Sequence, residues 1–560
     1  MTPVKKRLVR EKAIFILLPI LLFGLLLRGL NSTFGSPSLY ILNDEAIAHL
    51  SAFNMIAQKT PVSLANYTPL GAYIQIPFLV ISFFLMKILG LVNSASDFEF
   101  FVLANEGYFL FIPRLISALF GTLTIIVIYR ISRLLFEKKQ VALIGAFLGA
   151  VSFNLVHISH FGRPWSASLF FSSLAIYLAL KRSVFGSILF LAVSFGFHQG
   201  TILLLPLIVF LLRRTGLKNL VFPGALGLLA ILGLGSLTLE TGLVRAIENG
   251  QSLLRPKTII VDFFLQKEVA FSSLIFTLKN NLAFYFLKNL LTTDGLILIF
   301  SLLAMKELVK KEPFRTLIVY LLVYFISASL FFYPLLRYLL PLFIIMIPLA
   351  SYKVYELATL AGRKLPLKLS VYFSLAVISL INPTWWNWLY LQKPTFVKSR
   401  EWINNNVNLT DWLAFSEKRY YTHVPSRQAI EIIQVNNPGY YQRLYKFLKT
   451  ERGENARNML FLADFEGDSY AEKFENMSGV RQITYIVDYY LDPEESLLRK
   501  LPEKFEIAAS FSPLRGSERK IISEPLFDAS YNFPWGDQRA QLAMFSYSSI
   551  GPYVDILKVK

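Results

Sequence analysis

The stretch AIFILLPILLFGLLLRGL, residues 13–30, decides which class of fold this chain adopts. A helix needs about 20 predominantly apolar residues to cross the hydrocarbon core of a bilayer. The segment before it carries the basic side chains Lys5, Lys6, Arg7, Arg10 and Lys12. Because Lys and Arg are enriched at the cytoplasmic ends of spans, we predict that residues 13–30 form a retained first span that runs outward from a cytoplasmic N-terminus.

The overall composition also indicates a membrane protein. Of the 560 residues, 54% are hydrophobic and 15% are aromatic, a combination that soluble domains of this length rarely show. The net charge of +19 is explained by Lys and Arg at the ends of apolar runs, so no nucleic-acid partner is expected. The absence of cysteine excludes disulfides, thiolate metal ligands and a cysteine nucleophile. We therefore predict a multi-pass protein of the plasma membrane.

Further apolar runs alternate with basic clusters, and together they predict about 11 spans. The predicted spans are residues 13–30, 113–129, 141–159, 165–180, 183–197, 201–212, 220–239, 291–304, 314–332, 338–352 and 369–390. Residues 70–92 are also apolar, but a span there conflicts with the alternation of charge. That segment either spans or lies beside the membrane, and we favour a juxtamembrane or re-entrant position within an external loop at residues 31–113.

The character of the sequence changes after Lys393. Residues 394–560 are polar, with short strand-like runs such as 458–463 and 482–487 and helical candidates at 400–406 and 442–449. The predicted fold is therefore an all-α polytopic membrane domain at residues 1–393, followed by a small extracytoplasmic α/β domain at residues 394–560.

An acid pair follows the first span, and it has two interpretations. Asn43 and Asp44 could simply start a helix, because Asn is a good N-cap and a carboxylate favours the positive helix end. Alternatively, Asp44 faces an external cavity and acts as a general base, with Glu45 beside it. His49 lies four residues after Glu45 and shares its helix face. These two residues also form a minimal metal pair, but two ligands are too few to predict a metal site.

Three arginines stand at the predicted external ends of spans, against the general charge bias. They are Arg114, Arg163 and Arg337. A single exposed arginine can extend its side chain to lipid headgroups, but three at one level suggest a site for an anionic group. Guanidinium groups match phosphate geometry, so we predict that these residues bind a phosphate. Tyr67 and Tyr338, next to the same elements, are further site candidates.

Several short motifs in the same order resemble the type-C glycosyltransferases of the protein O-mannosyltransferase and lipid A aminoarabinose transferase kind. The motifs are the acid pair, Pro-Leu-Gly at 69–71, RLISALFG at 114–121, YRISRLLF at 129–136, the turn at 159–163 and RYLLP at 337–341. The resemblance covers roughly residues 10–390. Tyr67 and Thr68 stand where the mannosyltransferases usually have His and Pro, so we do not predict a protein mannosyltransferase.

The resemblance implies a type-C fold and a sugar donor linked to polyprenyl phosphate, used on the external face. It implies that Asp44 is the base and that arginines such as Arg114 and Arg337 contact the donor phosphate. No tightly bound cofactor is expected, and a divalent metal is left open. The expected partners are membrane lipid, the lipid-linked donor and an extracytoplasmic glycan, lipid or protein acceptor. Two alternatives stay open: a polysaccharide polymerase or ligase that uses lipid-diphosphate donors, and a non-enzymatic lipid or sugar transporter.

Overall fold

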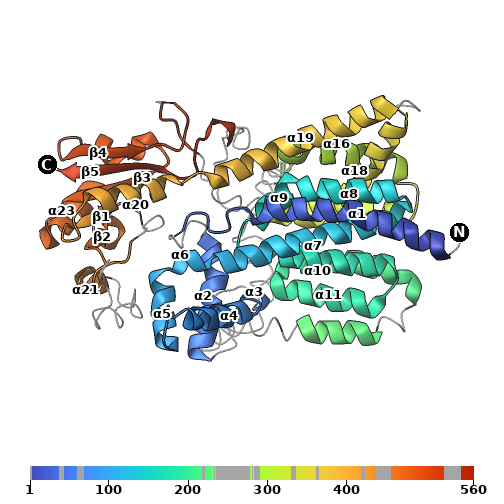
Figure 1. The fold of residues 1–560 in the computed structure, drawn as a ribbon, viewed down its shortest axis with the longest axis horizontal. Helices are drawn as coiled ribbons and strands as arrows, with labels where there is room; N and C mark the ends of the chain where they lie inside the picture. Colours follow the sequence, from blue (N-terminus) through green and yellow to red (C-terminus); the bar gives the residue numbers. More distant parts are fainter. Residues whose placement is uncertain are drawn as a thin grey trace.

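The protein consists of a long helical bundle joined to a smaller domain built around a sheet (Figure 1). The computed structural model describes residues 3–36, 43–59, 69–216, 221–231, 234, 278–279, 282, 290–329, 336–360, 365–417, 423–436, 456–516, 518–522 and 544–560. Both the helical membrane part and the small C-terminal sheet agree with the predicted fold class.

The bundle is built from apolar helices that run side by side (Figure 1). Its helices are α1 (Pro3–Gly29), α7 (Phe111–Phe136), α8 (Lys139–Val151), α9 (Phe153–Ser159), α10 (Trp165–Leu180), α11 (Val184–Phe197), α12 (Leu205–Leu212), α16 (Leu291–Leu308), α17 (Phe314–Ser329), α18 (Leu340–Leu360) and α19 (Leu365–Leu391). Short 3-10 turns, η1 (Gln199–Leu204), η2 (Arg213–Thr215) and η4 (Leu336–Leu339), lie between them.

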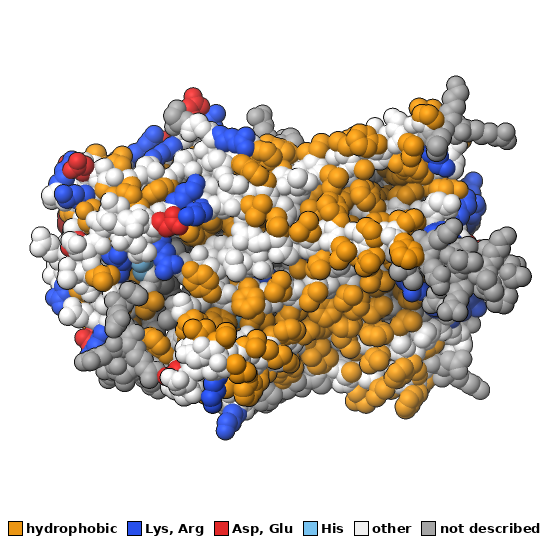
Figure 2. All heavy atoms as spheres, viewed as in Figure 1, with side chains coloured by type: hydrophobic (Ala, Val, Ile, Leu, Met, Phe, Trp, Pro, Cys, Tyr) orange, Lys and Arg blue, Asp and Glu red, His pale blue; other side chains and the backbone are white. Residues whose placement is uncertain are grey.

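Many large apolar side chains lie on the outside of the bundle, which is what a lipid environment requires. Large side chains such as Phe15, Phe185 and Val323 are exposed. Figure 2 shows a broad apolar surface over the bundle, with Lys and Arg at the end farther from the sheet domain and over the sheet domain itself. Among the described residues, four helices are long and apolar enough to cross a membrane, or five if the bent pair α8–α9 is one span. The expected count of about 11 spans stays a prediction.

The predicted external segment between α1 and α7 forms a group of short helices. They are α2 (Asn43–Gln58), α3 (Leu70–Tyr73), α4 (Ile76–Ile88), α5 (Ala95–Ala104) and α6 (Glu106–Phe109). In Figure 1, α2 and α5 lie across the direction in which α1, α7 and α10 run. They share a small core that includes Ala52, Leu79 and Phe109. Residues 70–88 are long and apolar enough to span a membrane. The juxtamembrane or re-entrant position of the 70–92 segment therefore also stays a prediction.

The bundle contains a helix break held by two buried residues of opposite charge. The chain bends by 51° between α8 and α9, at Ser152. The guanidinium of Arg28 donates to the carbonyl oxygens of Gly149 (2.7 Å) and Ala150 (2.8 Å), at the C-terminal end of α8. A helix C-terminus carries partial negative charge and lacks partners for its last carbonyls, so a cation there satisfies both needs.

The other half of the break is held by a carboxylate. Asp294, where α16 departs from helical geometry, accepts from the backbone N–H of Phe153 (2.9 Å) and Asn154 (3.0 Å) and from the Ser152 hydroxyl (3.1 Å). The Asn154 side-chain amide donates to it as well, at 2.7 Å. These contacts satisfy the N–H groups at the start of α9 that have no partner within the helix, where partial positive charge favours an anion. A cation and an anion therefore hold the two sides of the break. Arg28 binds the last carbonyl oxygens of α8, and Asp294 binds the first N–H groups of α9.

The C-terminal domain has a five-stranded mixed sheet in the order β2-β1-β3-β5-β4. Its strands are β1 (Leu413–Phe415), β2 (Met459–Phe461), β3 (Tyr485–Tyr490), β4 (Phe505–Phe511) and β5 (Tyr553–Val559). Its helices and 3-10 turns are α20 (Thr395–Asn406), α21 (Arg427–Asn436), η5 (Leu462–Asp464), α23 (Tyr470–Val480), η6 (Pro493–Glu495), α24 (Leu497–Lys500) and η8 (Met544–Ser546).

This sheet combines two kinds of strand pairing. β1 pairs in parallel with β2 and β3, while β5 is antiparallel to β3 and β4. β2 and β3 fall on or beside two of the strand-like runs predicted from sequence, and α20 contains the helical candidate at 400–406. The other helical candidate, 442–449, lies outside the described residues.

Among the described residues, the two domains touch near the predicted site. Ile430 of α21 packs against Phe100 and Leu103 of α5. The guanidinium of Arg515 lies 4.7 Å from the ring centroid of Trp385, near the end of α19. The sheet domain therefore stands against the same end of the bundle as the short helices that carry the acid pair.

Candidate active site

The centre of the site is a fully buried ion pair between α2 and α7. Nε of Arg114 lies 2.7 Å from Oε1 of Glu45, and its Nη2 lies 2.8 Å from Oε2. The Glu45 side chain is 0% exposed and that of Arg114 is 3% exposed. Nη1 of Arg114 also donates to the carbonyl oxygens of Ser32 (3.1 Å) and Phe34 (2.6 Å). A paired geometry of this kind is among the stronger hydrogen-bonded arrangements in proteins.

This pair joins two residues that the sequence suggested for different roles. Glu45 was expected beside the catalytic base, and Arg114 was expected to bind phosphate. In the structure the guanidinium of Arg114 is occupied by a carboxylate and two carbonyl oxygens. The contact instead ties α2 to α7 and to the turn that follows α1, which holds the first turn of α2 in place.

A third element reaches the same carboxylate from the turn after α9. The backbone N–H of Gly162 donates to Oε1 of Glu45 at 2.6 Å. A Cβ added at Gly162 would lie 2.9 Å from the Pro113 ring carbons and 3.0 Å from the carboxylate oxygen, so the position accepts only glycine without a shift. The turn is therefore packed directly on α2 and α7, and its next residue, Arg163, lies beside this contact.

Arg163 is a buried arginine stacked on aromatic rings. Its guanidinium carbon lies 4.3 Å from the ring centroid of Trp165 and 5.9 Å from that of Phe161. Stacking on a ring fixes the plane of a guanidinium. The arginine is therefore held in place within the same turn that contacts Glu45.

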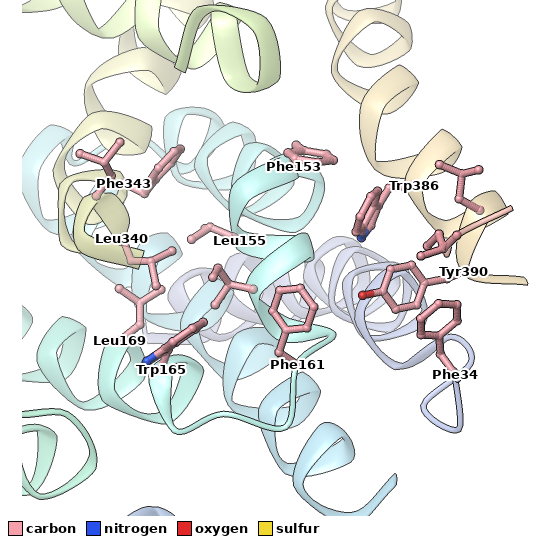
Figure 3. Packing of buried hydrophobic residues seen from close by; sticks show 14 of the residues in the cluster. Phe34, Phe153, Leu155, Phe161, Trp165, Leu169, Leu340, Phe343, Trp386 and Tyr390 are labelled. Atoms are coloured by element: carbon pink, nitrogen blue, oxygen red, sulfur yellow. The ribbon is translucent and has the colours of Figure 1, made fainter. Parts of the chain in front are cut away.

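Aromatic side chains surround this turn (Figure 3). The rings of Phe34 and Tyr390 have centroids 4.4 Å apart, and Tyr390 lies 5.1 Å from Trp386 of the same helix, α19. His160, in the turn, lies 4.5 Å from Tyr390. Figure 3 shows Phe161 between the Trp165 side and the Tyr390–Phe34 side of this cluster. The last turns of α19 thus close one side of the site before the chain enters the sheet domain.

His49 is buried on the same helix as the acid pair, and burial sets its protonation. Its Nδ1 lies 2.9 Å from Oε1 of Gln75, while Nε2 of Gln75 donates to the carbonyl of Gly71 at 2.8 Å. Because Gln75 presents an acceptor, Nδ1 of His49 carries the proton. Burial lowers the pKa of His49 to about 4, against a smaller opposite effect of the Gln75 hydrogen bond. His49 is therefore neutral at pH 7, and its Nε2 has no hydrogen-bond partner among the described residues.

Other predicted site residues are described only in part. Asp44 is the second residue of α2, and its side chain lies outside what the structure describes. Arg337 lies in η4 with its side chain likewise outside the description, and Tyr67 lies outside the described residues altogether. Tyr338 is half-buried in η4. The roles of these four residues stay predictions.

Glu45 and His49, the two possible metal ligands named from the sequence, contact different partners in the structure. Glu45 is occupied by Arg114 and Gly162, whereas His49 contacts Gln75. No group of three His, Cys, Asp or Glu side chains within the described ranges could hold a metal ion.

Sequence reasoning missed four residues that build this region. Gly162 and Gln75 carry no signal that a single sequence could reveal. Arg28 and Asp294 do carry one, because an ionisable residue inside an apolar run is costly and marks a specific partner. Both lie in segments that were predicted as spans, and both are buried with hydrogen-bond partners.

Comparison with known proteins gives resemblance in structure only. No family model matches the chain, and no curated protein matches its sequence. The structure is similar to that of ArnT from Cupriavidus metallidurans bound to undecaprenyl phosphate, with a TM-score of 0.48 and 11% identity over 89% of this chain and 96% of ArnT.

Two further solved structures are similar over most of this chain. AglB from Archaeoglobus fulgidus, an archaeal oligosaccharyltransferase in complex with an inhibitory peptide and a dolichol-phosphate, gives a TM-score of 0.43 and 14% identity over 86% of this chain and 69% of AglB. The arabinofuranosyltransferase AftD from Mycobacteria gives 0.37 and 12%, over 98% of this chain and 40% of AftD.

ArnT is a lipid A aminoarabinose transferase, and all three neighbours are type-C glycosyltransferases. The similarity of this chain to these glycosyltransferases is one of overall fold alone.

Proposed function

We propose that this protein is a membrane glycosyltransferase that moves a sugar from a polyprenyl-phosphate donor to an acceptor outside the cytoplasm. Asp44 is the general base in this proposal, and Arg163 and Arg337 are the arginines that face the donor phosphate. The acceptor is a glycan, a lipid or a protein, and the reaction takes place where the sheet domain meets the bundle.

One contact carries the proposal. Gly162 donates its backbone N–H to Glu45 at 2.6 Å. Asp44 is the residue before Glu45, and Arg163 is the residue after Gly162. The contact therefore joins the first turn of α2, which carries Asp44, to the turn that carries Arg163, although more than 100 residues separate them in sequence. A carboxylate beside a cationic group is the minimum that transfer from a phosphate-linked donor requires.

The reaction divides between these groups as follows. The acceptor's hydroxyl or amine attacks the anomeric carbon, and its proton goes to the carboxylate of Asp44. The bond between that carbon and the donor phosphate oxygen breaks, and polyprenyl phosphate leaves with the electron pair. The arginines stabilise the negative charge that develops on the phosphate. A single displacement of this kind inverts the configuration at the anomeric carbon.

Glu45 and Arg114 have a supporting role in this proposal. Their mutual pairing occupies both groups, so neither is assigned to substrate. The pair instead fixes the first turn of α2, and with it the position of Asp44. Such fixed placement of a reacting group can itself supply a large part of a rate enhancement.

The test measures transfer of labelled sugar from a polyprenyl-phosphate donor in membranes that contain the protein. Asp44→Asn is expected to lower the transfer rate about 100-fold or more, which is the usual contribution of a general base. Asp97→Asn is the matched control, because Asp97 belongs to the same segment but caps α5 on the surface. Unchanged transfer by Asp44→Asn at normal protein level would overturn the base assignment.

The phosphate role is tested in the same assay. Arg163→Gln is expected to raise the donor KM or lower kcat by at least tenfold, because a charge-assisted contact is worth more than about 1.4 kcal/mol. Arg182→Gln, in a turn at the other end of α10, is the control and is expected to leave transfer unchanged. If both variants behave like the parent protein, the phosphate is held elsewhere.

A further inference from the structure

An apolar cavity lies between α19 and the rest of the bundle, away from the candidate active site. Its volume is about 650 Å³. α19 contributes Tyr372, Ala376 and Ser379 to its wall, and the bundle contributes Leu143, Phe147 and Phe300. The volume lies within the range of about 300–1,000 Å³ that ligand sites usually have.

The cavity exists because α19 packs closely at only one of its ends. Near the sheet domain, Trp386, Leu389 and Tyr390 are buried against the bundle. Toward the other end, the helix turns one apolar face to the cavity and the opposite face outward. Phe373, on that outward face, is 71% exposed. A helix that is apolar on both faces lies in hydrocarbon, and the described residues that line the gap behind it are mostly apolar.

An empty gap of this size inside a bilayer is unfavourable. An apolar cavity of about 150 Å³ already takes up apolar guests, and this one is several times larger. Water is a poor occupant because the wall offers few polar groups, while a lipid chain can enter from the surrounding bilayer.

The charges at one end of the cavity indicate which kind of lipid the cavity binds. Gln140 and Leu369 line that end. Lys138 and Lys139 precede Gln140 at the start of α8, and Lys368 precedes Leu369 near the start of α19. This is the end of the bundle expected to be cytoplasmic, where anionic lipids concentrate. A lipid chain is as apolar as the leucines around it, so the chain alone gives no selectivity, and the headgroup charge must supply it.

We propose that this cavity binds an anionic phospholipid of the cytoplasmic leaflet. Its acyl chain lies between α19 and α8, and its headgroup lies beside Lys139 and Lys368. The lipid fills the gap behind the helix that leads to the sheet domain, so it supports the position of α19 without taking part in sugar transfer. The donor lipid is a different occupant, because its phosphate belongs at the opposite end of the bundle under the proposed function.

The test measures which lipids stay bound to the full-length protein in detergent, by native mass spectrometry after addition of phosphatidylglycerol or phosphatidylcholine. Each lysine near an anionic headgroup contributes about fivefold in affinity, so we expect phosphatidylglycerol to be retained about tenfold or more over phosphatidylcholine. Equal retention of the two lipids would overturn the proposal, and so would retention of a polyprenyl phosphate at this site.

Two variants locate the bound lipid. Ala376→Trp fills the cavity from α19 and is expected to reduce phosphatidylglycerol binding to the detergent background. Val377→Trp is its matched control, because the next side chain on the helix is 45% exposed on the outward face. Equal retention by the two tryptophan variants would place the lipid elsewhere. A thermal unfolding curve checks that both variants are folded, and Ala376→Ile gives a smaller filling if the tryptophan does not fold.

The headgroup contact is tested separately. Lys139→Gln with Lys368→Gln is expected to remove most of the preference for phosphatidylglycerol. Lys310→Gln with Lys311→Gln, on the exposed turn after α16, removes the same charge at residues that do not line the cavity and is expected to keep the preference. A preference that survives the first pair of substitutions would contradict the assignment of the headgroup to these lysines.

Discussion

The pairing of Glu45 with Arg114 makes a prediction that separates a structural arginine from a phosphate ligand. Glu45→Gln removes the negative charge while nearly keeping the shape of the side chain. Arg114 then stays buried with its charge uncompensated, in a place where it is 3% exposed. Breaking a buried ion pair in this way lowers the free energy of unfolding by about 3–5 kcal/mol. We expect the midpoint of thermal unfolding in detergent to fall, and sugar transfer to fall with it.

A double-mutant cycle gives the sharper result. Arg114→Met alone should cost a similar amount, because it leaves the carboxylate of Glu45 buried without its cation. Glu45→Met with Arg114→Met removes both charges, and it should recover part of the loss. The recovery of stability is incomplete because the carbonyl oxygens of Ser32 and Phe34 lose their donor. Each unsatisfied carbonyl destabilises the protein by about 1–3 kcal/mol.

The donor KM decides between the two roles of Arg114. If the arginine is structural, the double variant regains stability and its donor KM stays close to that of the parent protein. Additive losses in unfolding, or a donor KM that rises at least tenfold in a double variant with recovered stability, would refute the structural role and return Arg114 to the phosphate site.

Three further predictions concern neighbouring parts of the site. Asp294→Asn should lower the free energy of unfolding by about 1.5–3 kcal/mol for each charged hydrogen bond lost at the start of α9. Arg28→Gln should also destabilise the protein, because it weakens the contact at the end of α8. Unchanged thermal unfolding in both variants would contradict the role of these two charges in holding the break. His49 has a folded-state pKa of about 4 against an ordinary 6.5, so the unfolded chain binds the extra proton between these values. Stability should therefore fall by about 3 kcal/mol as the pH drops from 6.5 to 4, and His49→Gln should remove that slope. Gly162→Ala should lower transfer at least tenfold, because the new Cβ would meet Glu45 and the facing ring; parent-like transfer would show that the turn adapts freely.

Local sequence was enough to predict a helical bundle and a small C-terminal sheet, while the number of spans stays a prediction. Apolar runs are long and separated by basic clusters, and the physics of the bilayer translates that pattern directly into helices. Polar composition after residue 393 likewise indicated a separate domain, and the strands near residues 459–461 and 485–490 were visible as short apolar runs. These features depend on neighbours in the sequence, so no knowledge of the packing was needed.

The break between α8 and α9 was not predictable in the same way. Residues 141–159 form one continuous apolar run, and they were predicted as a single span. The bend depends on Arg28 and Asp294, which approach from α1 and α16. Each satisfies backbone groups that a continuous helix would have satisfied itself, so the bend becomes favourable only when both are in place.

The acid pair shows the same division between sequence and structure. The sequence alone identified Asp44, Glu45, Arg114 and Arg163 as unusual charges, because ionisable groups near lipid are costly and need a partner. Which charge partners which depended on packing: Glu45 meets Arg114 across 69 positions and Gly162 across 117. Pairing at such separations is set by how α2, α7 and the turn after α9 come together, and the tertiary structure alone decided that Arg114 holds a carboxylate.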